Sequence, residues 1–198
     1  MSTGLLLSGG MDSVALAYWK RPDAGYTIDY GQLAAEGEIQ AAAAVCEAIS
    51  IRHRVIRADC RQVGMGDMAG TPPSGLSPIS EWWPFRNQLI ITLAGASAVV
   101  DGVTELMVGS IRTDAAHSDG RSEFFEGISK VMEFQEGGIR VRAPAITLSA
   151  VELVRISGIP FGLLAWSHSC HVAAFACGRC RGCTKHAETM RELGYGDY

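Results

Sequence analysis

The sequence lacks the features that mark a nucleic-acid-binding surface or a membrane protein. It has 17 Lys and Arg against 21 Asp and Glu, a net charge of −4, and no run of basic residues. Because proteins that hold nucleic acid neutralise many phosphates, we expect no nucleic-acid partner. The sequence also lacks an apolar run of about 18 residues and the pattern of a signal peptide. We therefore expect a cytoplasmic protein with no membrane partner.

Internal repeats, low-complexity runs and Ser/Gly-rich linkers are absent as well, which indicates one compact unit. With 198 residues, 47% of them hydrophobic and 19% charged, the chain can bury enough apolar surface to fold without disulfides. Cysteines stay reduced in the cytoplasm, so the six cysteines need another explanation.

Short apolar runs alternate with segments of helical character along most of the chain. This alternation is typical of βαβ units, in which a parallel sheet carries helices on both faces. The predicted fold class is therefore α/β, with a main domain of residues 1–165 and a small C-terminal region, residues 166–198, packed on it. The predicted strands are residues 4–7, 26–28, 54–56 and 105–108, and the predicted helices are residues 11–19, 33–49, 88–100, 123–134, 150–156 and 184–193.

Residues 59–84 show no periodic pattern. This stretch has four prolines, four glycines and the adjacent Trp82 and Trp83. Long loops of this kind are usually functional or disordered, so a lid over a site and a mobile surface loop both remain open. The two tryptophans favour a loop that packs or stacks on another part of the molecule.

A glycine-containing loop directly follows the first predicted strand and opens the first predicted helix. Gly9 and Gly10 allow a tight turn whose N–H groups face an anion, and the helix N-terminus adds its positive dipole end. Ser8 and Ser13 add hydroxyl donors. Asp12 would repel a phosphate unless it holds Mg²⁺ or orients the loop. The alternative is an ordinary turn in which Asp12 or Ser13 caps the helix.

Four cysteines cluster near the end of the chain with the spacing C-x6-C-x2-C-x2-C. They are Cys170, Cys177, Cys180 and Cys183. Four thiolates without an open position suit a structural Zn²⁺, whereas an iron–sulfur cluster and disulfide pairing are the alternatives. A zinc knuckle can also bind nucleic acid, but we expect a clamp that pins the C-terminal helix.

Three further motifs accompany these two segments: Asp29-Tyr30-Gly31-Gln32, Pro84-Phe85-Arg86-Asn87, and Thr113-Asp114 followed by Arg121-Ser122-Glu123-Phe124. In this order the motifs resemble the 7-cyano-7-deazaguanine synthase (QueC) family of PP-loop ATP pyrophosphatases. The resemblance extends from Gly4 to about Arg191. It implies a PP-loop α/β domain with a C-terminal zinc site. It also implies a ligase that forms C–N bonds, converting 7-carboxy-7-deazaguanine, ATP and ammonia to the nitrile through an acyl-adenylate.

The resemblance also implies roles for individual residues and a set of partners. The residues implied to bind ATP with Mg²⁺ are Ser8, Gly9, Gly10, Asp12, Ser13, Tyr30, Gly31 and Gln32. Those implied to bind the deazaguanine acid are Arg86, Asn87, Asp114, Arg121 and Glu123. Ser8, Asp12, Ser13 and Arg86 are the implied catalytic residues. Members of the family often form homodimers.

The sequence departs from the family pattern at several positions. Leu33 and Ala34 stand where members usually carry a basic pair, and Ala150 stands where they usually carry a lysine. The loop between Cys170 and Cys177 is also shorter than usual. Loss of the lysine removes a charge that stabilises leaving phosphate groups, which bears most on the second adenylation that forms the nitrile.

Arg112, Arg140 and Arg142 are candidates to supply the missing charge. The departures also support a second reading, a QueC-like ligase of a bacterial anti-phage (CBASS-type) system that passes the activated deazaguanine to a protein amine. A third reading is a PP-loop domain that binds nucleotide without catalysis. The intact loop that contains Asp12 argues against this third reading.

Overall fold

The computed structural model describes residues 2–73, 75–77 and 79–196. Within them five strands form one sheet, in which every pair of neighbouring strands is parallel. The strands are β1 (Thr3–Leu6), β2 (Ala24–Asp29), β3 (Arg52–Arg57), β4 (Glu105–Val108) and β5 (Arg140–Arg142), and their order is β3-β2-β1-β4-β5. The α/β class predicted from the sequence is confirmed.

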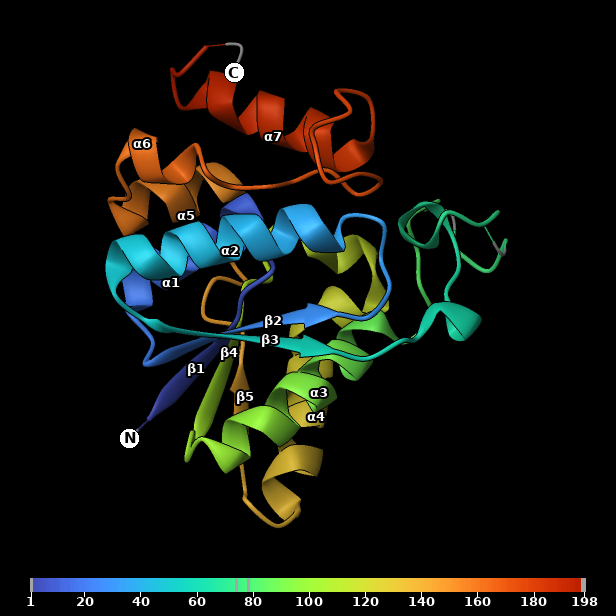
Figure 1. Cartoon of the computed structure of the whole chain (residues 1–198), viewed down its shortest axis with the longest axis vertical. Coiled ribbons are helices and arrows are strands. Elements are labelled where there is room, and N and C mark those ends of the chain that lie inside the picture. Colours follow the sequence, from blue (N-terminus) through green and yellow to red (C-terminus); the bar gives the residue numbers. More distant parts are fainter. Residues whose placement is uncertain (1, 74, 78, 197–198) are drawn as a thin grey trace.

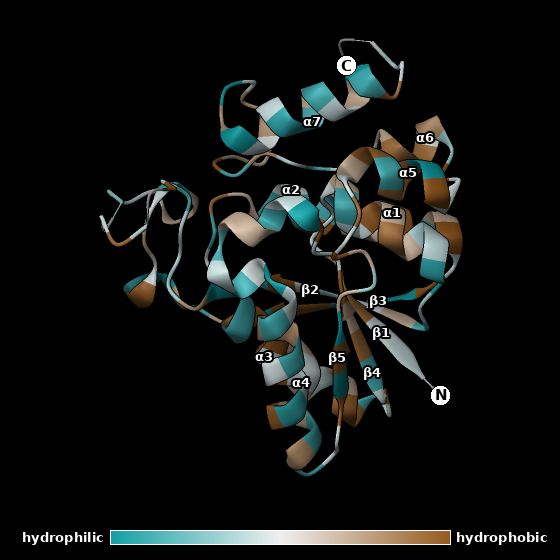
Figure 2. Cartoon of the chain, turned by 180° about the vertical axis from the view of Figure 1, so that it is seen from behind, coloured by the Kyte–Doolittle hydropathy of each residue, from teal (hydrophilic) through white to brown (hydrophobic). Residues whose placement is uncertain are grey.

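Helices cover both faces of the sheet (Figure 1). They are α1 (Met11–Lys20), α2 (Ala35–Ile49), α3 (Arg86–Val100), α4 (Ser122–Phe134), α5 (Ala150–Ser157), α6 (Phe161–Leu164) and α7 (Arg181–Glu192). α3 and α4 lie on one face, whereas the other helices lie on the opposite face. In Figure 2 apolar residues gather where α1, α5 and α6 lie together.

Alternation along the strands divides the core into two clusters. Leu5 and Leu7 point to the face covered by α1, α2 and α5, while Leu6 points to the face covered by α3 and α4. Successive side chains of a strand face opposite ways, so a parallel sheet buried on both faces needs an unbroken apolar run. The run Leu5-Leu6-Leu7 supplies it, and all three side chains are buried.

The strand order places a switch point beside β1. The chain moves outward from β1 through β2 to β3, and then returns to pair β4 with the other side of β1. In open sheets of this kind, the crevice at the carboxyl ends of the two strands that flank the switch is the usual ligand site. The loops that follow β1 and β4 are therefore expected to form a site.

The predicted elements mostly match the observed ones. All four predicted strands and all six predicted helices are present, with shifted ends; α2, for example, begins at Ala35 rather than at Leu33. The sequence analysis missed β5 and α6. β5 is a three-residue edge strand in which only Val141 is buried, and α6 is a single turn.

Part of the predicted long loop, residues 59–84, is packed. Trp83 is buried, and its ring meets that of Tyr30 edge to face, with centroids 4.9 Å apart. Met68 is buried in the same cluster, and two short turns, η1 (Arg61–Val63) and η2 (Asp67–Ala69), give the loop local order. The expectation that the tryptophans anchor the loop is confirmed for Trp83.

The C-terminal region packs on the sheet domain through α7. Met190 of α7 is fully buried in the cluster that contains Leu153 of α5. The division at residue 165 stays a prediction. Among the described residues, all helices are too short or too polar to cross a bilayer.

Candidate functional site

A cavity of about 270 Å³ opens at the carboxyl ends of β1 and β4, at the switch point of the sheet. Ser8, which follows β1, lines it together with Gly109 and Ser110, which follow β4. The rest of the wall comes from the first turn of α1, from α2 and α3, and from α7 with the segment that precedes it. The position agrees with the general rule for open parallel sheets.

The glycine loop forms the turn between β1 and α1. Gly9 has φ +72°, and a Cβ atom there would lie 2.6 Å from the carbonyl oxygen of Glu38, so glycine is required for both reasons. The Ser13 hydroxyl donates to the Gly10 carbonyl at 2.9 Å and lies 3.3 Å from the Ser8 hydroxyl. No side chain caps the N-terminus of α1, which leaves its first N–H groups to a ligand.

Two carboxylates and one ammonium group meet beside this loop. Lys185 Nζ donates to Asp12 Oδ2 at 2.9 Å and lies 3.8 Å from Asp114 Oδ1. Asp12 Oδ1 is buried without a hydrogen-bond partner. Burial raises the pKa of Asp12 although Lys185 opposes the shift. For Lys185, burial lowers the pKa, but the charges of Asp12 and Asp114 outweigh burial and leave its pKa above the usual value.

A further carboxylate, Glu38 of α2, lines the cavity near the end of β2. Gln32 donates to Glu38 Oε2 at 2.8 Å and to the carbonyl oxygen of Ile28 at 3.0 Å. Gln32 also accepts the N–H of Tyr30 at 2.9 Å, so its buried amide joins the end of β2 to α2. Burial raises the pKa of Glu38 to about 7, against the opposing effects of Gln32 and Arg86.

The raised pKa of Glu38 predicts a pH-dependent effect of the Glu38→Gln substitution. The raised pKa of Glu38 stabilises the folded wild-type protein fully at pH values below 4.5, the pKa of this carboxyl group in the unfolded chain. This stabilisation is lost as the pH rises through about 7, because the folded protein must then bury a charge. Glutamine stays neutral. Near pH 8 we expect the variant to be more stable than wild type by about 1 kcal/mol or more, with a smaller difference near pH 5. Urea unfolding at both pH values measures this, and an equal effect at both would contradict it.

Arg86 and Asn87 are the first two residues of α3 and line the cavity, so the helix begins two residues before its predicted start at residue 88. The Asn87 side-chain amide donates to the Asp119 carbonyl oxygen at 2.9 Å, and the Asn87 N–H donates to the Asp119 carboxylate at 3.3 Å. The Arg86 guanidinium contacts Met68 Sδ at 3.0 Å. Phe85, which precedes the helix, has φ +53° and is exposed.

The structure brings some of the predicted site residues together and leaves others apart. Those that line the cavity are Ser8, Gly10, Asp12, Ser13, Tyr30, Arg86, Asn87 and Asp114. Gly9 is outside the lining and packs against α2, and Gly31 and Gln32 line a separate pocket with Arg61. Arg121 and Glu123 are exposed outside the lining, where Arg121 donates to the Ala115 carbonyl oxygen. The ligand roles of all these residues stay predictions.

Sequence reasoning missed three charged groups at the site. Glu38 and Lys185 line the cavity, and Asp119 holds Asn87. Glu38 lies within α2 and Lys185 within α7, where charged residues are common on exposed faces. The one available signal for Lys185 was its position two residues after Cys183.

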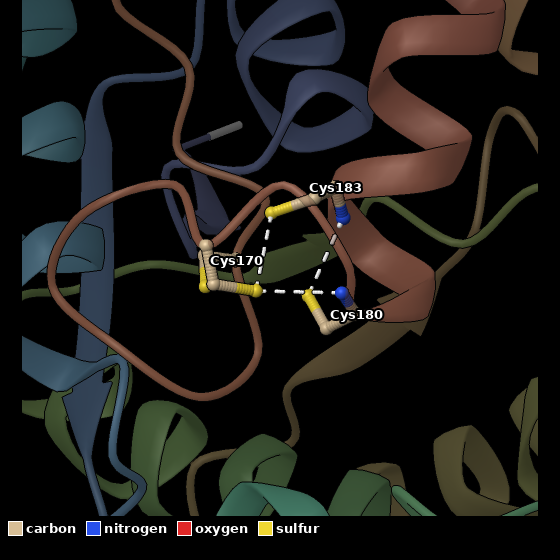
Figure 3. A group of neighbouring side chains, drawn as sticks. Cys170, Cys180 and Cys183 are labelled. Atoms are coloured by element: carbon tan, nitrogen blue, oxygen red, sulfur yellow. Dashed lines mark hydrogen bonds between the residues drawn. The ribbon is translucent and has the colours of Figure 1, made fainter.

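The four C-terminal cysteines converge on one point. The sulfur atoms of Cys170, Cys177, Cys180 and Cys183 all lie within 4.8 Å of one another. Figure 3 shows Cys170, Cys180 and Cys183 gathered beside the first turn of α7. A tetrahedron with bonds of about 2.3 Å to a central zinc has edges of about 3.8 Å, and Cys177 and Cys183 sulfurs are 3.9 Å apart. The cluster could therefore hold a metal ion.

Backbone N–H groups donate hydrogen bonds to two of these sulfur atoms. The N–H of Cys180 donates to Cys177 Sγ at 3.3 Å, and the N–H of Cys183 donates to Cys180 Sγ at 3.4 Å. N–H donation from Arg179 and Cys180 lowers the pKa of Cys177 to about 6, which favours the ligand form. Burial raises the pKa of Cys183, which favours its thiol form.

The cysteine segment adjoins the cavity directly. Cys170 and the three neighbouring histidines, His168, His171 and His186, line it. Burial lowers the pKa of each histidine, which favours neutral imidazoles. The backbone N–H of His168 donates to the Gly9 carbonyl oxygen at 2.8 Å, and this bond joins the cysteine segment to the glycine loop.

The fold and the cavity define an α/β protein with a ligand site at the switch point of a parallel sheet and a four-cysteine cluster beside it. The sequence matches the profile of the family described as "Queuosine biosynthesis protein QueC" over residues 3–194. The chain belongs to this QueC family.

Curated relatives named 7-cyano-7-deazaguanine synthase match nearly the full chain. The protein of that name from Desulforudis audaxviator is 32% identical over 96% of this chain and 96% of its own length. Those from Anaeromyxobacter dehalogenans and Methanosarcina barkeri are 31% and 28% identical, over 98% and 97% of this chain and 92% and 94% of their own lengths. Membership in this family, and relatives that are named as synthases, indicate an enzyme.

Proposed function

We propose that this chain uses ATP to activate 7-carboxy-7-deazaguanine and then aminates it, giving AMP and pyrophosphate. The match to the QueC family over residues 3–194 carries this proposal. The cavity supports it, because Ser8, Asp12 and Ser13 of the glycine loop line the same space as Arg86 and Asn87. An anionic nucleotide and an acid substrate can therefore meet there.

In this reaction the protein must position the reactants and stabilise charge, and it needs no nucleophilic side chain. The substrate carboxylate attacks the α-phosphorus of ATP, pyrophosphate leaves, and an acyl-adenylate forms. Ammonia then displaces AMP to give the amide and releases one proton. A second ATP adenylates the amide oxygen, and loss of AMP with the remaining N–H protons gives the nitrile. Catalysis of such transfers rests on alignment of the reactants and on preorganised charge.

In this scheme the glycine loop holds the phosphates with its N–H groups and the hydroxyls of Ser8 and Ser13. Asp12 holds Mg²⁺ that accompanies ATP, a role that suits its buried, unpartnered Oδ1. Arg86 faces the reacting carboxylate, and Asp114 accepts N–H groups of the guanine-like edge. The four cysteines hold a structural zinc ion, for which their separations and ligand type fit.

A second candidate is a ligase that transfers the activated deazaguanine to a protein amine. Two positions favour it: Leu33 is exposed outside the cavity, and Ala150 is buried in the core, so neither brings a basic group to the site. This reaction needs only the first adenylation. A protein acceptor and a homodimer stay predictions.

The test is a reaction of the purified chain with ATP, Mg²⁺, 7-carboxy-7-deazaguanine and ammonium, followed by mass spectrometry. We expect AMP and free nitrile, with no AMP when the deazaguanine acid is omitted. AMP with only amide, or with no released deazaguanine product, would favour the protein ligase. Absence of AMP in the complete reaction would contradict both proposals.

A further inference from the structure

Lys185 brings a positive charge into the cavity from the far end of the chain. The sequence has only three lysines, and the other two, Lys20 and Lys130, are exposed and lie outside the cavity lining. Lys185 Nζ reaches Asp12 in the first turn of α1 at 2.9 Å. Any anion seated in the glycine loop therefore lies within reach of this ammonium group.

The cavity lining carries more carboxylates than Lys and Arg side chains. Three carboxylates, those of Asp12, Glu38 and Asp114, line it, whereas Arg86 and Lys185 are the Lys and Arg residues among its described lining. A phosphate beside the glycine loop meets Asp12, and this like-charge repulsion must be offset nearby. Lys185 donates to the Asp12 carboxylate, whereas Arg86 contacts Met68 and Asn87.

Arg112, Arg140 and Arg142, the candidates to supply the missing charge, pair with carboxylates outside the cavity. Arg112 pairs with Glu152 at 3.4 Å, Arg140 lies 3.9 Å from Glu133, and Arg142 lies 3.6 Å from Glu105. All three are outside the cavity lining. They do not supply the charge in this arrangement.

The four-cysteine segment fixes the position of Lys185. Cys180 caps α7, because its sulfur accepts the Cys183 N–H and its carbonyl oxygen accepts the Thr184 N–H at 3.0 Å. Gly182 packs so closely on the preceding segment that a Cβ atom would overlap the Ser169 carbonyl oxygen. Lys185 thus stands on a helical turn held by the cysteines.

We propose that Lys185 binds the phosphate groups that the glycine loop holds, and that the four-cysteine segment serves to carry this lysine into the cavity. The proposal rests on the proposed function insofar as ATP is the ligand. In it, the cysteine cluster contributes a binding residue to the site and is more than a clamp for α7.

The test measures binding of Mg²⁺-ATP and of inorganic pyrophosphate by titration calorimetry, without turnover. Charge-assisted hydrogen bonds contribute enough that Lys185→Met is expected to weaken both ligands by about tenfold or more. Lys185→Arg should retain much of the affinity, because it keeps the charge. Lys130→Met, an exposed lysine outside the cavity, is the matched control and should bind as wild type does. Melting temperature and metal content verify that each variant is folded.

A double variant separates contact with phosphate from simple neutralisation. If Lys185 only offsets the carboxylates, Asp114→Asn combined with Lys185→Met should restore wild-type affinity, which would overturn the proposal. Continued weak binding by the double variant supports direct contact. Unchanged affinity of Lys185→Met, with wild type binding both ligands, would also overturn it while leaving the proposed function intact. Failure of the wild-type chain to bind either ligand would overturn both.

Discussion

Replacing Cys180 with serine is expected to abolish binding of the metal ion proposed for the four-cysteine cluster and to lower the melting temperature by about 10 °C or more. Cys180 contributes one of four converging sulfurs, and that sulfur also accepts the N–H groups of His171 and Cys183. A hydroxyl is a poor ligand for a thiolate-selective ion, and loss of the ion leaves the remaining thiolates to repel one another. Elemental analysis and scanning calorimetry measure the two effects.

Cys60→Ser is the matched control, because Cys60 lies in the loop after β3 and outside the cluster. It should keep the metal and the wild-type melting temperature. Retention of a full equivalent of metal by Cys180→Ser would contradict the assignment of four ligands. A metal-free wild-type protein of unchanged stability would contradict the structural role.

Asp12→Asn is expected to lower ATP-dependent AMP formation by about 100-fold or more while the protein stays folded. The substitution preserves shape but removes the charge from a carboxylate whose Oδ1 is buried without a partner and whose Oδ2 accepts from Lys185. Burial already raises the pKa of Asp12, so its neutral analogue avoids the cost of a desolvated charge. We therefore expect the melting temperature to change little although Lys185 loses its ion pair.

Asp23→Asn provides the comparison for this result. Asp23 is exposed at the amino ends of β1 and β2, away from the cavity, where it accepts the Thr3 N–H at 2.7 Å; asparagine can accept the same bond. Its AMP formation should match that of wild type. Asp12→Asn with wild-type turnover would show that the loop carboxylate is dispensable and would remove the proposed metal ligand.

The sequence predicts the parts of the fold that have a strong local signal. The run Leu5-Leu6-Leu7 marks β1, and the adjacent glycine loop and α1 follow without interruption, so the strand, turn and helix could be recognised together. β5 has no such signal, because Arg140 and Arg142 flank a single buried Val141 at the edge of the sheet. Pairing with β4 creates that strand, and pairing depends on the tertiary fold.

The same distinction applies to the candidate site. Ser8, Asp12 and Ser13 could be predicted because a contiguous motif holds them, and the structure places all three on the cavity. The approach of Lys185 could not be predicted, because it depends on the path of the chain between residues 13 and 185. The resemblance implies Arg121 as a substrate residue; in the structure it lies outside the cavity lining and donates to the Ala115 carbonyl oxygen, and its role stays a prediction.

The contact between Asp12 and Lys185 spans 173 positions of the chain. Forming a contact between such distant residues reduces the conformational entropy of the chain by a large amount, so it forms later than local turns do. At about 5–20 residues per second, the ribosome adds Asp12 roughly 9 to 35 seconds before it adds Lys185. In the interval the Asp12 carboxylate has neither the lysine nor the cysteine segment over it. A nascent chain of this protein can therefore hold much of its sheet while the ligand pocket is still incomplete.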